Sequence, residues 1–322
     1  MEEWKTQLTR DPLPPLLSSG NPAIVYFARR DLLGEKPGPV GLLWSLPAAR
    51  SLLKKQRPDG SWKYPGKAAC DGQDYDQLET FRSLGILVEN FGLERREPAI
   101  SKAVDLLFSR QTEEGDFRGI YGRQYTPNYT GAILELVVKS GYSNDRRVDL
   151  AFRWLLSIRQ DGGGWAIPCL TTGDGLDRRT MKGPPIGPDR TRPFSHLATG
   201  MVLRAFAAHP EYNEAEEASR AGSLLASRLF KRDARYIGRH TPEYWTKFSY
   251  PFWFTDLLSA LDSLSKMGFG PEDPACAAGL EWFRREQGPD GSWKLRLLRT
   301  GGGDVDQWVA LAICRVFKRF YG

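Results

Sequence analysis

The sequence is poor in the residues that bind metals or form disulfide bonds. Its 322 residues contain only three histidines and four cysteines, and the cysteines are scattered without a Cys-x-x-Cys pair: Cys70, Cys169, Cys276 and Cys314. Scattered cysteines in a chain of this length argue against a disulfide framework and against a small zinc module. The fold must therefore rest on a hydrophobic core, for which the chain is long enough.

Long apolar runs are also missing. No stretch of about 18 apolar residues exists, so no segment is expected to span a membrane. Residues 1–5 lack the start of a secretory signal. The net charge is +6, but no Lys/Arg run is dense enough to favour nucleic acid. We predict a cytoplasmic protein without a nucleic-acid partner, and attraction to acidic lipids leaves peripheral membrane contact open.

Tryptophan is abundant, and several of the ten tryptophans end a repeated motif. Gln-Arg-Pro-Asp-Gly-Ser-Trp (56–62) recurs as Gln-Gly-Pro-Asp-Gly-Ser-Trp (287–293), with a shorter copy at 160–165 and a copy at 111–117 in which Phe replaces Trp. The first three glutamines are 55 and 49 residues apart, and the gap of 127 before the fourth fits two units with one motif lost near 228–236. A period of this length indicates a repeat architecture.

Each motif lies between two helical patterns. Before the third copy, Val148, Ala151, Leu155 and Ile158 fall on one helix face, whereas the segments after the motifs are apolar on most of their circumference. The unit is thus an outer amphipathic helix, a glycine-rich turn and a buried inner helix. We predict five outer helices and inner helices near 21–34, 74–91, 126–140, 194–208, 250–267 and 304–320.

The predicted fold is one all-α domain over residues 1–322, an α/α toroid of repeated helix pairs. An open solenoid of helix pairs is the alternative arrangement. A solenoid normally ends in degenerate polar caps, yet here the two best motif copies lie in the first and last units. Closure into a barrel is therefore favoured.

The Gln-x-x-x-Gly-x-Trp spacing resembles the QW motif of squalene and oxidosqualene cyclases, and the same toroid with weaker motifs is found in protein prenyltransferase β subunits. The resemblance covers roughly residues 40–320. It implies a terpenoid-cyclase-like toroid in which the Gln side chain caps the next helix and the Trp stacks on it. Such a role is physically reasonable, because an amide can satisfy free N–H groups at a helix start.

Two Asp-x-Asp-Gln elements, at 74–77 and 304–307, each open a predicted inner helix. They resemble the Asp-x-Asp-Asp element of class II terpenoid cyclases, whose middle Asp protonates an alkene or epoxide, although Gln stands in the fourth place of both copies. The resemblance implies a middle acid and a neighbouring Asp in each copy: Asp306, Asp76, Asp304 and Asp74. Such an acid needs burial and a nearby like charge to stay neutral. The alternative is that these residues cap the helices.

Aromatic residues gather at or before the predicted starts of inner helices. Ring faces stabilise a carbocation without trapping it, and they also suit a prenyl chain that undergoes no chemistry. The substrate-binding candidates are Trp253, Phe254, Phe252, Trp308, Tyr129, Tyr125 and Phe194. Ordinary core packing is the alternative for each of them.

His196 opens a predicted inner helix and could hydrogen-bond a catalytic Asp. The segment 194–199 also resembles the Tyr-His-Thr zinc element of prenyltransferase β subunits, but the Asp-x-Cys pair of that site is not found. We therefore predict no metal site. A helix-capping or solvated His196 is the alternative.

The segment 169–193, rich in Gly and Pro, is long for a loop in a compact repeat and carries several arginines. It could be a lid that receives a diphosphate, or simply a solvated loop. The glycine runs 162–164 and 301–303 do not follow a strand, so they form no phosphate-binding fingerprint.

Three classes of function fit these features. The first is a class II terpenoid cyclase that protonates and cyclises an isoprenoid, with no cofactor. The second is a non-catalytic toroid that binds an isoprenoid or another apolar small molecule. A carbohydrate-active enzyme is the third, since α/α toroids also serve that chemistry, and a prenyltransferase is less favoured. The polarity of the cavity, and whether an Asp lies buried and facing it, would separate these classes.

Overall fold

The structure is a computed structural model that describes residues 3–67, 71–234, 236, 238–298 and 304–322. Cys70 and the glycine run 301–303 lie outside the described residues. The described chain consists of helices, turns and a few isolated β-bridges, without a strand. The all-α prediction is therefore confirmed.

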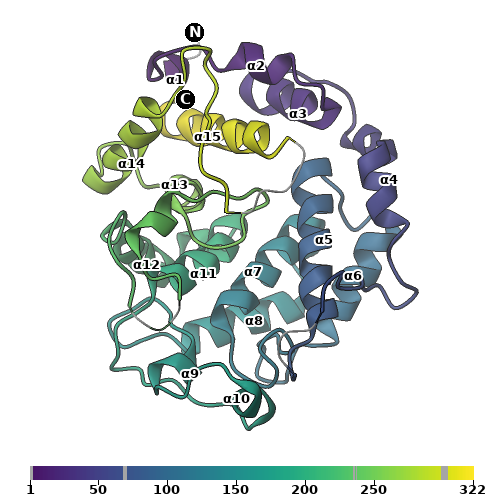
Figure 1. The fold of residues 1–322 in the computed structure, drawn as a ribbon, viewed down its shortest axis with the longest axis vertical. Helices are drawn as coiled ribbons and strands as arrows, with labels where there is room; N and C mark the ends of the chain where they lie inside the picture. The colour runs from purple at the N-terminus through teal and green to yellow at the C-terminus, as the bar shows by residue number, and fades with distance from the viewer. Residues whose placement is uncertain (1–2, 68–70, 235, 237, 299–303) are drawn as a thin grey trace.

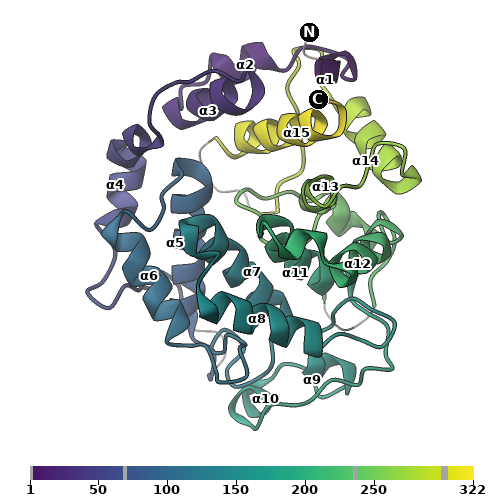
Figure 2. The same cartoon turned by 180° about the vertical axis from the view of Figure 1, so that it is seen from behind.

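Six helices of the described chain form an inner ring: α3 (Pro22–Phe27, continued by the π-turn η1, Ala28–Leu32), α5 (Tyr75–Phe91), α7 (Pro127–Val137), α11 (His196–Ala208), α13 (Leu257–Lys266) and α15 (Val305–Tyr321). Each helix contacts the next, and α3 also contacts α15, so the ring is closed. The chain ends accordingly lie side by side in Figures 1 and 2. This confirms the barrel over the open solenoid.

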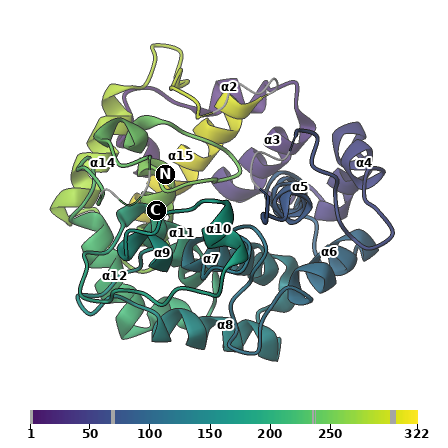
Figure 3. The same ribbon diagram turned by 60° about the horizontal axis from the view of Figure 1, so that its bottom comes forward.

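Five described helices lie outside the ring: α4 (Pro47–Leu53), α6 (Pro98–Phe108), α8 (Arg146–Ser157), α12 (Glu216–Ala226) and α14 (Pro274–Arg285). They surround α5, α7 and α11 in Figure 3. In α8, the side chain of Asp145 accepts a hydrogen bond from the Arg147 N–H at 2.9 Å, and the apolar stripe faces inward. Every residue of α7, by contrast, is buried, as expected of an inner helix.

Short elements connect these layers. Two helices precede the ring, α1 (Glu3–Thr6) and α2 (Leu13–Leu17), and α1 packs on α15. The others are η2 (Val40–Ser45), η3 (Val138–Tyr142), α9 (Pro168–Thr171), α10 (Arg178–Lys182), η4 (Tyr212–Glu214) and η5 (Pro242–Thr246).

The motif turns form a belt between the two layers, and we call residues 56–62, 111–117, 160–165 and 287–293 the belt. Its tryptophan N–H groups donate to carbonyls in the last turn of the preceding outer helix: Trp62 to Leu52 (2.8 Å), Trp165 to Leu155 (2.7 Å) and Trp293 to Phe283 (2.8 Å). Carbonyls there lack a partner within the helix. The three tryptophans are at most 2% exposed.

Two of the belt glutamines, Gln56 and Gln111, differ from the prediction in the direction of their hydrogen bonds. The amide of Gln56 donates to the Gly60 carbonyl at 3.0 Å and to the Ala99 carbonyl in the first turn of α6 at 2.7 Å. Gln111 makes the same two bonds, the second to Arg147 in α8 at 2.8 Å. The side chain thus donates to carbonyls at the next helix start, rather than accepting from N–H groups there.

The last belt turn joins the end of the chain to its beginning. Gln287 donates to the Arg10 carbonyl and accepts from the Arg10 N–H, both at 3.0 Å. Gly291 has a φ of +82°, and a Cβ there would lie 2.2 Å from the Asp11 carbonyl oxygen, so only glycine fits. The N-terminal segment therefore takes the place of the next repeat.

Trp245 fills the place of the lost motif between α12 and α13. It is 1% exposed and its indole N–H donates to the Lys231 carbonyl at 2.9 Å. The replacement comes from later in the chain than the interval 228–236, where the period placed the lost motif.

The fifth predicted inner helix, 250–267, begins at Leu257 rather than at residue 250. A reciprocal cap sets this start: the Asp256 carboxylate accepts the Ser259 N–H at 2.7 Å, and the Ser259 hydroxyl accepts the Asp256 N–H at 2.9 Å. The preceding segment, 249–255, is irregular. Because this segment is not helical, three of its aromatic side chains, Tyr250, Phe252 and Trp253, line the barrel interior.

Candidate functional site

An aromatic chamber of about 390 Å³ lies inside the ring, between α5, α7 and the irregular segment 249–255. We define it by its principal apolar lining residues: Phe81, Leu136, Tyr250, Pro251, Phe252 and Trp253. Its volume falls within the range of small-molecule sites, which are typically concave and mainly apolar. Leu298 and Val305 complete the lining on the side of α15.

The charged residues of the chamber wall are engaged with one another. Arg82 pairs with Glu79 at 3.2 Å, and its guanidinium lies over the Trp253 ring, 4.5 Å from the centroid. Glu135 pairs with the buried Arg204 at 3.0 Å. Each of these charges has an ion-pair partner, although the Nε of Arg82 and the guanidinium nitrogens of Arg204 make no hydrogen bond within the described chain. Ring faces make up most of the remaining wall.

Five of the seven predicted aromatic residues lie in or around this chamber. Phe252 and Trp253 line it. Trp308 is parallel to Tyr250, with ring centroids 5.5 Å apart. Two more form a second layer behind the lining: Tyr129 meets Phe81 edge-on at 6.1 Å, and Phe254 meets Trp253 edge-on at 6.0 Å.

The other two predicted aromatics lie elsewhere. The Tyr125 hydroxyl donates to Glu114 at 2.9 Å and its ring is 5.8 Å from that of Trp154, on the outer side of the belt. Phe194 packs over Gly164 in the third belt turn. Neither residue lines the aromatic chamber.

The first Asp-x-Asp-Gln element lies at the start of α5. Asp74 is the N-cap of that helix and accepts the Gln77 N–H at 2.8 Å, as the capping alternative holds. The Tyr64 N–H and the Arg57 guanidinium, at 2.8 and 2.7 Å, lower the pKa of Asp76. A carboxylate that is only partly buried and is stabilised in this way is a poor proton donor.

The second element lies at the start of α15. Asp304 and Asp306 are both exposed, and Asn21 donates to Asp304 at 2.9 Å. Val305, between them, reaches the aromatic chamber, whereas neither Asp is among its lining residues. The two copies thus lie at the N-terminal ends of inner helices, as expected, but their Asp side chains are not buried as a neutral acid requires.

Asp256 is a buried carboxyl that the sequence analysis did not single out. It is 2% exposed, and burial raises its pKa to about 7, although its bond to Ser259 and the charge of Arg204 oppose the rise. Like Asp304 and Asp306, it is not among the lining residues of the aromatic chamber, but it accepts a hydrogen bond from the backbone of Ser249, which is one of them. The available signal was an Asp three residues before a Ser, directly after an aromatic run.

His196 is neither solvated nor near the predicted acids. It is 3% exposed, its ring lies 4.5 Å from that of Trp245, and burial lowers its pKa to about 4. Asp233 accepts the His196 backbone N–H at 2.7 Å and the Ser195 hydroxyl at 2.6 Å. His196 is therefore a buried residue in the first turn of α11, and the prediction that it is solvated is wrong.

The segment 169–193, which contains α9 and α10, is docked on the barrel at the bottom of Figures 1 and 2. Gln124 donates to the Thr180 and Pro184 carbonyls, at 2.6 and 2.9 Å. Arg178 pairs with Asp71 at 3.0 Å. None of its arginines lines the aromatic chamber.

Among the residues that the structure describes, no cluster of three or more His, Cys, Asp or Glu is suited to hold a metal ion. No helix in the same residues is long and apolar enough to cross a bilayer.

Comparison with known proteins gives solved structures only, since no protein-family model and no curated protein matches the chain. The type II terpene cyclase MstE from Scytonema is 16% identical, with 87% of this chain and 98% of that chain covered and a TM-score of 0.32. A protein from Actinoplanes is 18% identical (83% and 96% covered, TM-score 0.32). A polysaccharide lyase is 12% identical (87% and 86% covered, TM-score 0.44). Scores this low assign no ligand or reaction to this chain.

Proposed function

We propose that this barrel binds an apolar small molecule of the isoprenoid class in its aromatic chamber. The observation that carries the proposal is a chamber walled by Phe81, Tyr250, Phe252 and Trp253, whose charged neighbours are already paired. Burying such a surface against a hydrocarbon chain gains about 25 cal/mol per Å². A sugar would instead leave most of its hydroxyl groups without partners.

Titration with neutral prenyl alcohols of two to four isoprene units, followed by intrinsic tryptophan fluorescence, tests this function. We expect saturable binding that strengthens with chain length until the chamber is full. Maltooligosaccharides serve as the matched polar probe and should not bind. Saccharide binding without alcohol binding would contradict the proposal, and mass spectrometry of a lipid extract of the purified protein would identify a ligand carried from the cell.

Protonation-initiated cyclisation is a second candidate function, favoured by Asp256. A carboxyl with a pKa of about 7 retains a proton at neutral pH, which an ordinary Asp does not. In this reaction the proton passes from Asp256 to an alkene carbon. The resulting carboxylate keeps the Ser259 N–H and the nearby Arg204 as stabilising partners. The cyclic cation then loses one proton from a carbon next to the cationic centre, which forms an alkene, and this proton balances the one that Asp256 gave up.

Three Asp→Asn variants distinguish the possible acids, because Asn retains the capping oxygen but carries no acidic proton. We expect Asp256→Asn to abolish cyclic products while prenyl-alcohol binding persists, and Asp76→Asn and Asp306→Asn to retain turnover. Gas chromatography of products from prenyl substrates is the measurement. Turnover that survives in Asp256→Asn and disappears in Asp306→Asn would instead support the acid that the sequence resemblance implies.

A further inference from the structure

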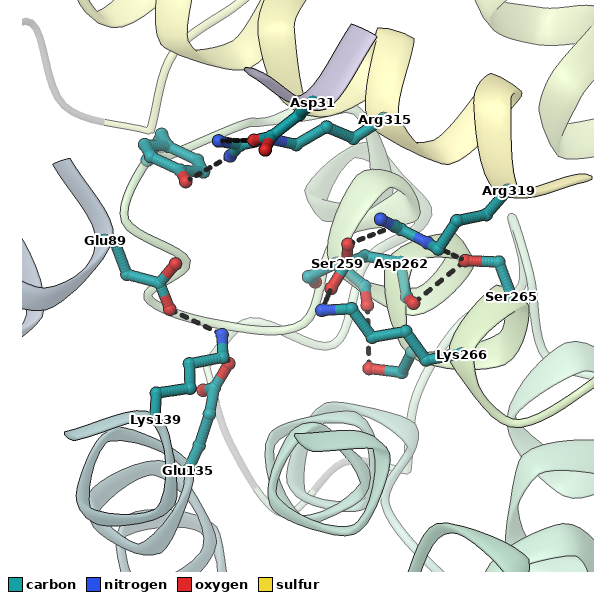
Figure 4. A network of polar contacts seen from close by, with 12 residues as sticks. Asp31, Glu89, Glu135, Lys139, Ser259, Asp262, Ser265, Lys266, Arg315 and Arg319 are labelled. Atoms are coloured by element: carbon teal, nitrogen blue, oxygen red, sulfur yellow. Dashed lines mark hydrogen bonds and ion pairs between the residues drawn. The ribbon is translucent and has the colours of Figure 1, made fainter. Parts of the chain in front are cut away.

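A second, charged chamber adjoins the aromatic chamber. It has a volume of about 540 Å³ and lies among the C-terminal halves of the inner helices α5, α13 and α15, with η1 and Lys139 closing its sides. The two chambers share three lining residues, Glu89, Tyr250 and Phe252. Figure 4 shows its carboxylates and cations facing one another across an open space. One elongated ligand could therefore extend from one chamber into the other.

Cations outnumber carboxylates in the described lining of this charged chamber. Six side chains are cationic and three are acidic, a surplus of three positive charges: Arg30, Lys139, Lys266, Arg315, Lys318 and Arg319 against Asp31, Glu89 and Asp262. Burial lowers the pKa of Lys266, and the like charges of Lys139 and Arg319 lower it further against the pull of Asp262. Unneutralised charge in a partly desolvated space is costly.

The carboxylates of the charged chamber are already shared. Asp31 pairs with Arg30 at 2.5 Å and with Arg315 at 2.6 Å. Asp262 pairs with Lys266 at 2.7 Å and also with Arg319. Each of these carboxylates thus serves two cations, which leaves donor capacity on the cations.

Helix dipoles account for only part of this surplus. Cations at helix C-termini are stabilised by the free carbonyls there. Lys318 acts in this way, since its ammonium donates to the Asp31 and Leu32 carbonyls at 2.9 and 3.1 Å. Lys139, by contrast, is paired with two carboxylates, Glu89 and Glu135. Arg315 and Lys266 each pair with a carboxylate that also serves a second cation, so a mobile anion would offset the excess charge beside Asp31 and Asp262.

We propose that the charged chamber binds a phosphorylated head group, a phosphate or diphosphate ester, on a ligand whose apolar part occupies the aromatic chamber. The apolar half of this statement rests on the proposed function. A carboxylate offers one negative charge, whereas a phosphate monoester carries about 1.5 to 2 and a diphosphate ester more, which better matches a surplus of three. Multiple oxygens also suit the forked donors of arginine.

Binding of three probes to the full chain, measured by calorimetry, tests the inference: geranylgeraniol, geranylgeranyl diphosphate and inorganic diphosphate. We expect the prenyl diphosphate to bind at least tenfold more tightly than the alcohol, and inorganic diphosphate to compete with it. Equal affinity for the alcohol and its diphosphate would overturn the head-group inference and leave the proposed function standing. Binding of inorganic diphosphate, with no binding of the alcohol and no contribution from the prenyl chain, would support the charged site and overturn the proposed function.

The double variant Arg30→Gln/Arg319→Gln lowers the surplus from three to one while Asp31 keeps Arg315 and Asp262 keeps Lys266. We expect at least a tenfold loss of affinity for the prenyl diphosphate and an unchanged affinity for the alcohol. The matched control is Arg153→Gln/Arg179→Gln, which removes the same charge from side chains that are 73% and 95% exposed. Equal losses in both double variants would overturn the inference, and melting temperatures verify that each variant is folded.

Discussion

The belt and the barrel interior of this protein are built on different rules. In the belt, the same contacts recur. Trp62, Trp165 and Trp293 each donate to a carbonyl in the last turn of the preceding outer helix, and Gln56 and Gln111 each donate to a carbonyl at the start of the next one. The interior repeats nothing. Its aromatic chamber lies on one side of the ring and its charged chamber takes different residues from each helix.

This difference reflects what each region must satisfy. Every helix end leaves the same unsatisfied backbone groups, so the same side chains recur there in three of the four belt turns, with Phe117 in place of Trp in the second. The ligand that we propose, in contrast, has no repeat, and its apolar and anionic parts would require different walls. We therefore expect the repeated belt residues to determine the fold, and the non-repeating residues inside the ring to determine which ligand binds.

The largest expected effect comes from the belt. Trp293→Ala removes a 2% exposed indole and its bond to Phe283, so the free energy of unfolding should fall by about 3–5 kcal/mol. Trp293→Phe is the matched control, because Phe117 fills the same place in the second repeat without an N–H donor. It should lose clearly less stability. Urea denaturation measures both, and an unchanged midpoint for Trp293→Ala would refute the structural role of the motif.

The next effect is a pH dependence with opposite signs at two helix starts. The folded-state pKa of Asp256 is raised from 3.8 to about 7, so the folded chain binds more protons and stability should decrease as pH rises from about 4 to 7. The pKa of His196 is lowered from 6.5 to about 4, so its contribution should decrease as pH falls through the same window. Each pH unit corresponds to about 1.4 kcal/mol per group.

The pH dependences of stability from Asp256 and His196 oppose each other. The difference in free energy of unfolding between the wild type and Asp256→Asn therefore gives the contribution of the Asp256 carboxyl alone. Denaturation at a series of pH values should show that the stability of the variant no longer decreases toward neutral pH. Its stability should still decrease toward acidic pH, because His196 is unchanged. Parallel profiles for the two proteins would mean that Asp256 is not held in a destabilised ionised state.

A smaller belt effect is expected for Gln111→Leu. The Gly115 and Arg147 carbonyls lose a donor, which should cost about 1–3 kcal/mol. Glu113→Gln, an exposed change in the same turn, should leave the unfolding midpoint unchanged. Equal midpoints for the two variants would show that the belt amide does not contribute.

The smallest effect on stability should come from Trp253→Ala, in the wall of the aromatic chamber. This indole is only partly buried, so the loss should be about 1 kcal/mol, well below that for Trp293→Ala. The affinity for prenyl alcohols should nevertheless decrease about tenfold, because the apolar contact surface of the indole ring is lost from the chamber. If instead Trp253→Ala destabilised the protein strongly and bound the alcohols normally, the division between belt and interior would fail.

The sequence by itself determined the order of the helices and the positions of the belt. Both depend on short-range patterns: helical periodicity before Gln160 and a Gly that admits the close approach of the next segment, as Gly291 does. The one misplaced start, Leu257, came from a local cap at Asp256 that outweighed the apolar pattern before it.

Only the tertiary structure decided which polar side chains are buried together. Asp31 and Arg315 are 284 positions apart in the chain, and no local pattern joins them. The same holds for Asp256, whose raised pKa depends on burial by surrounding helices rather than on its own neighbours in sequence. The Asp-x-Asp-Gln elements were conspicuous in sequence, but their Asp residues are partly buried in the first copy and exposed in the second. A motif does not specify the solvation of a carboxyl, which sets its pKa.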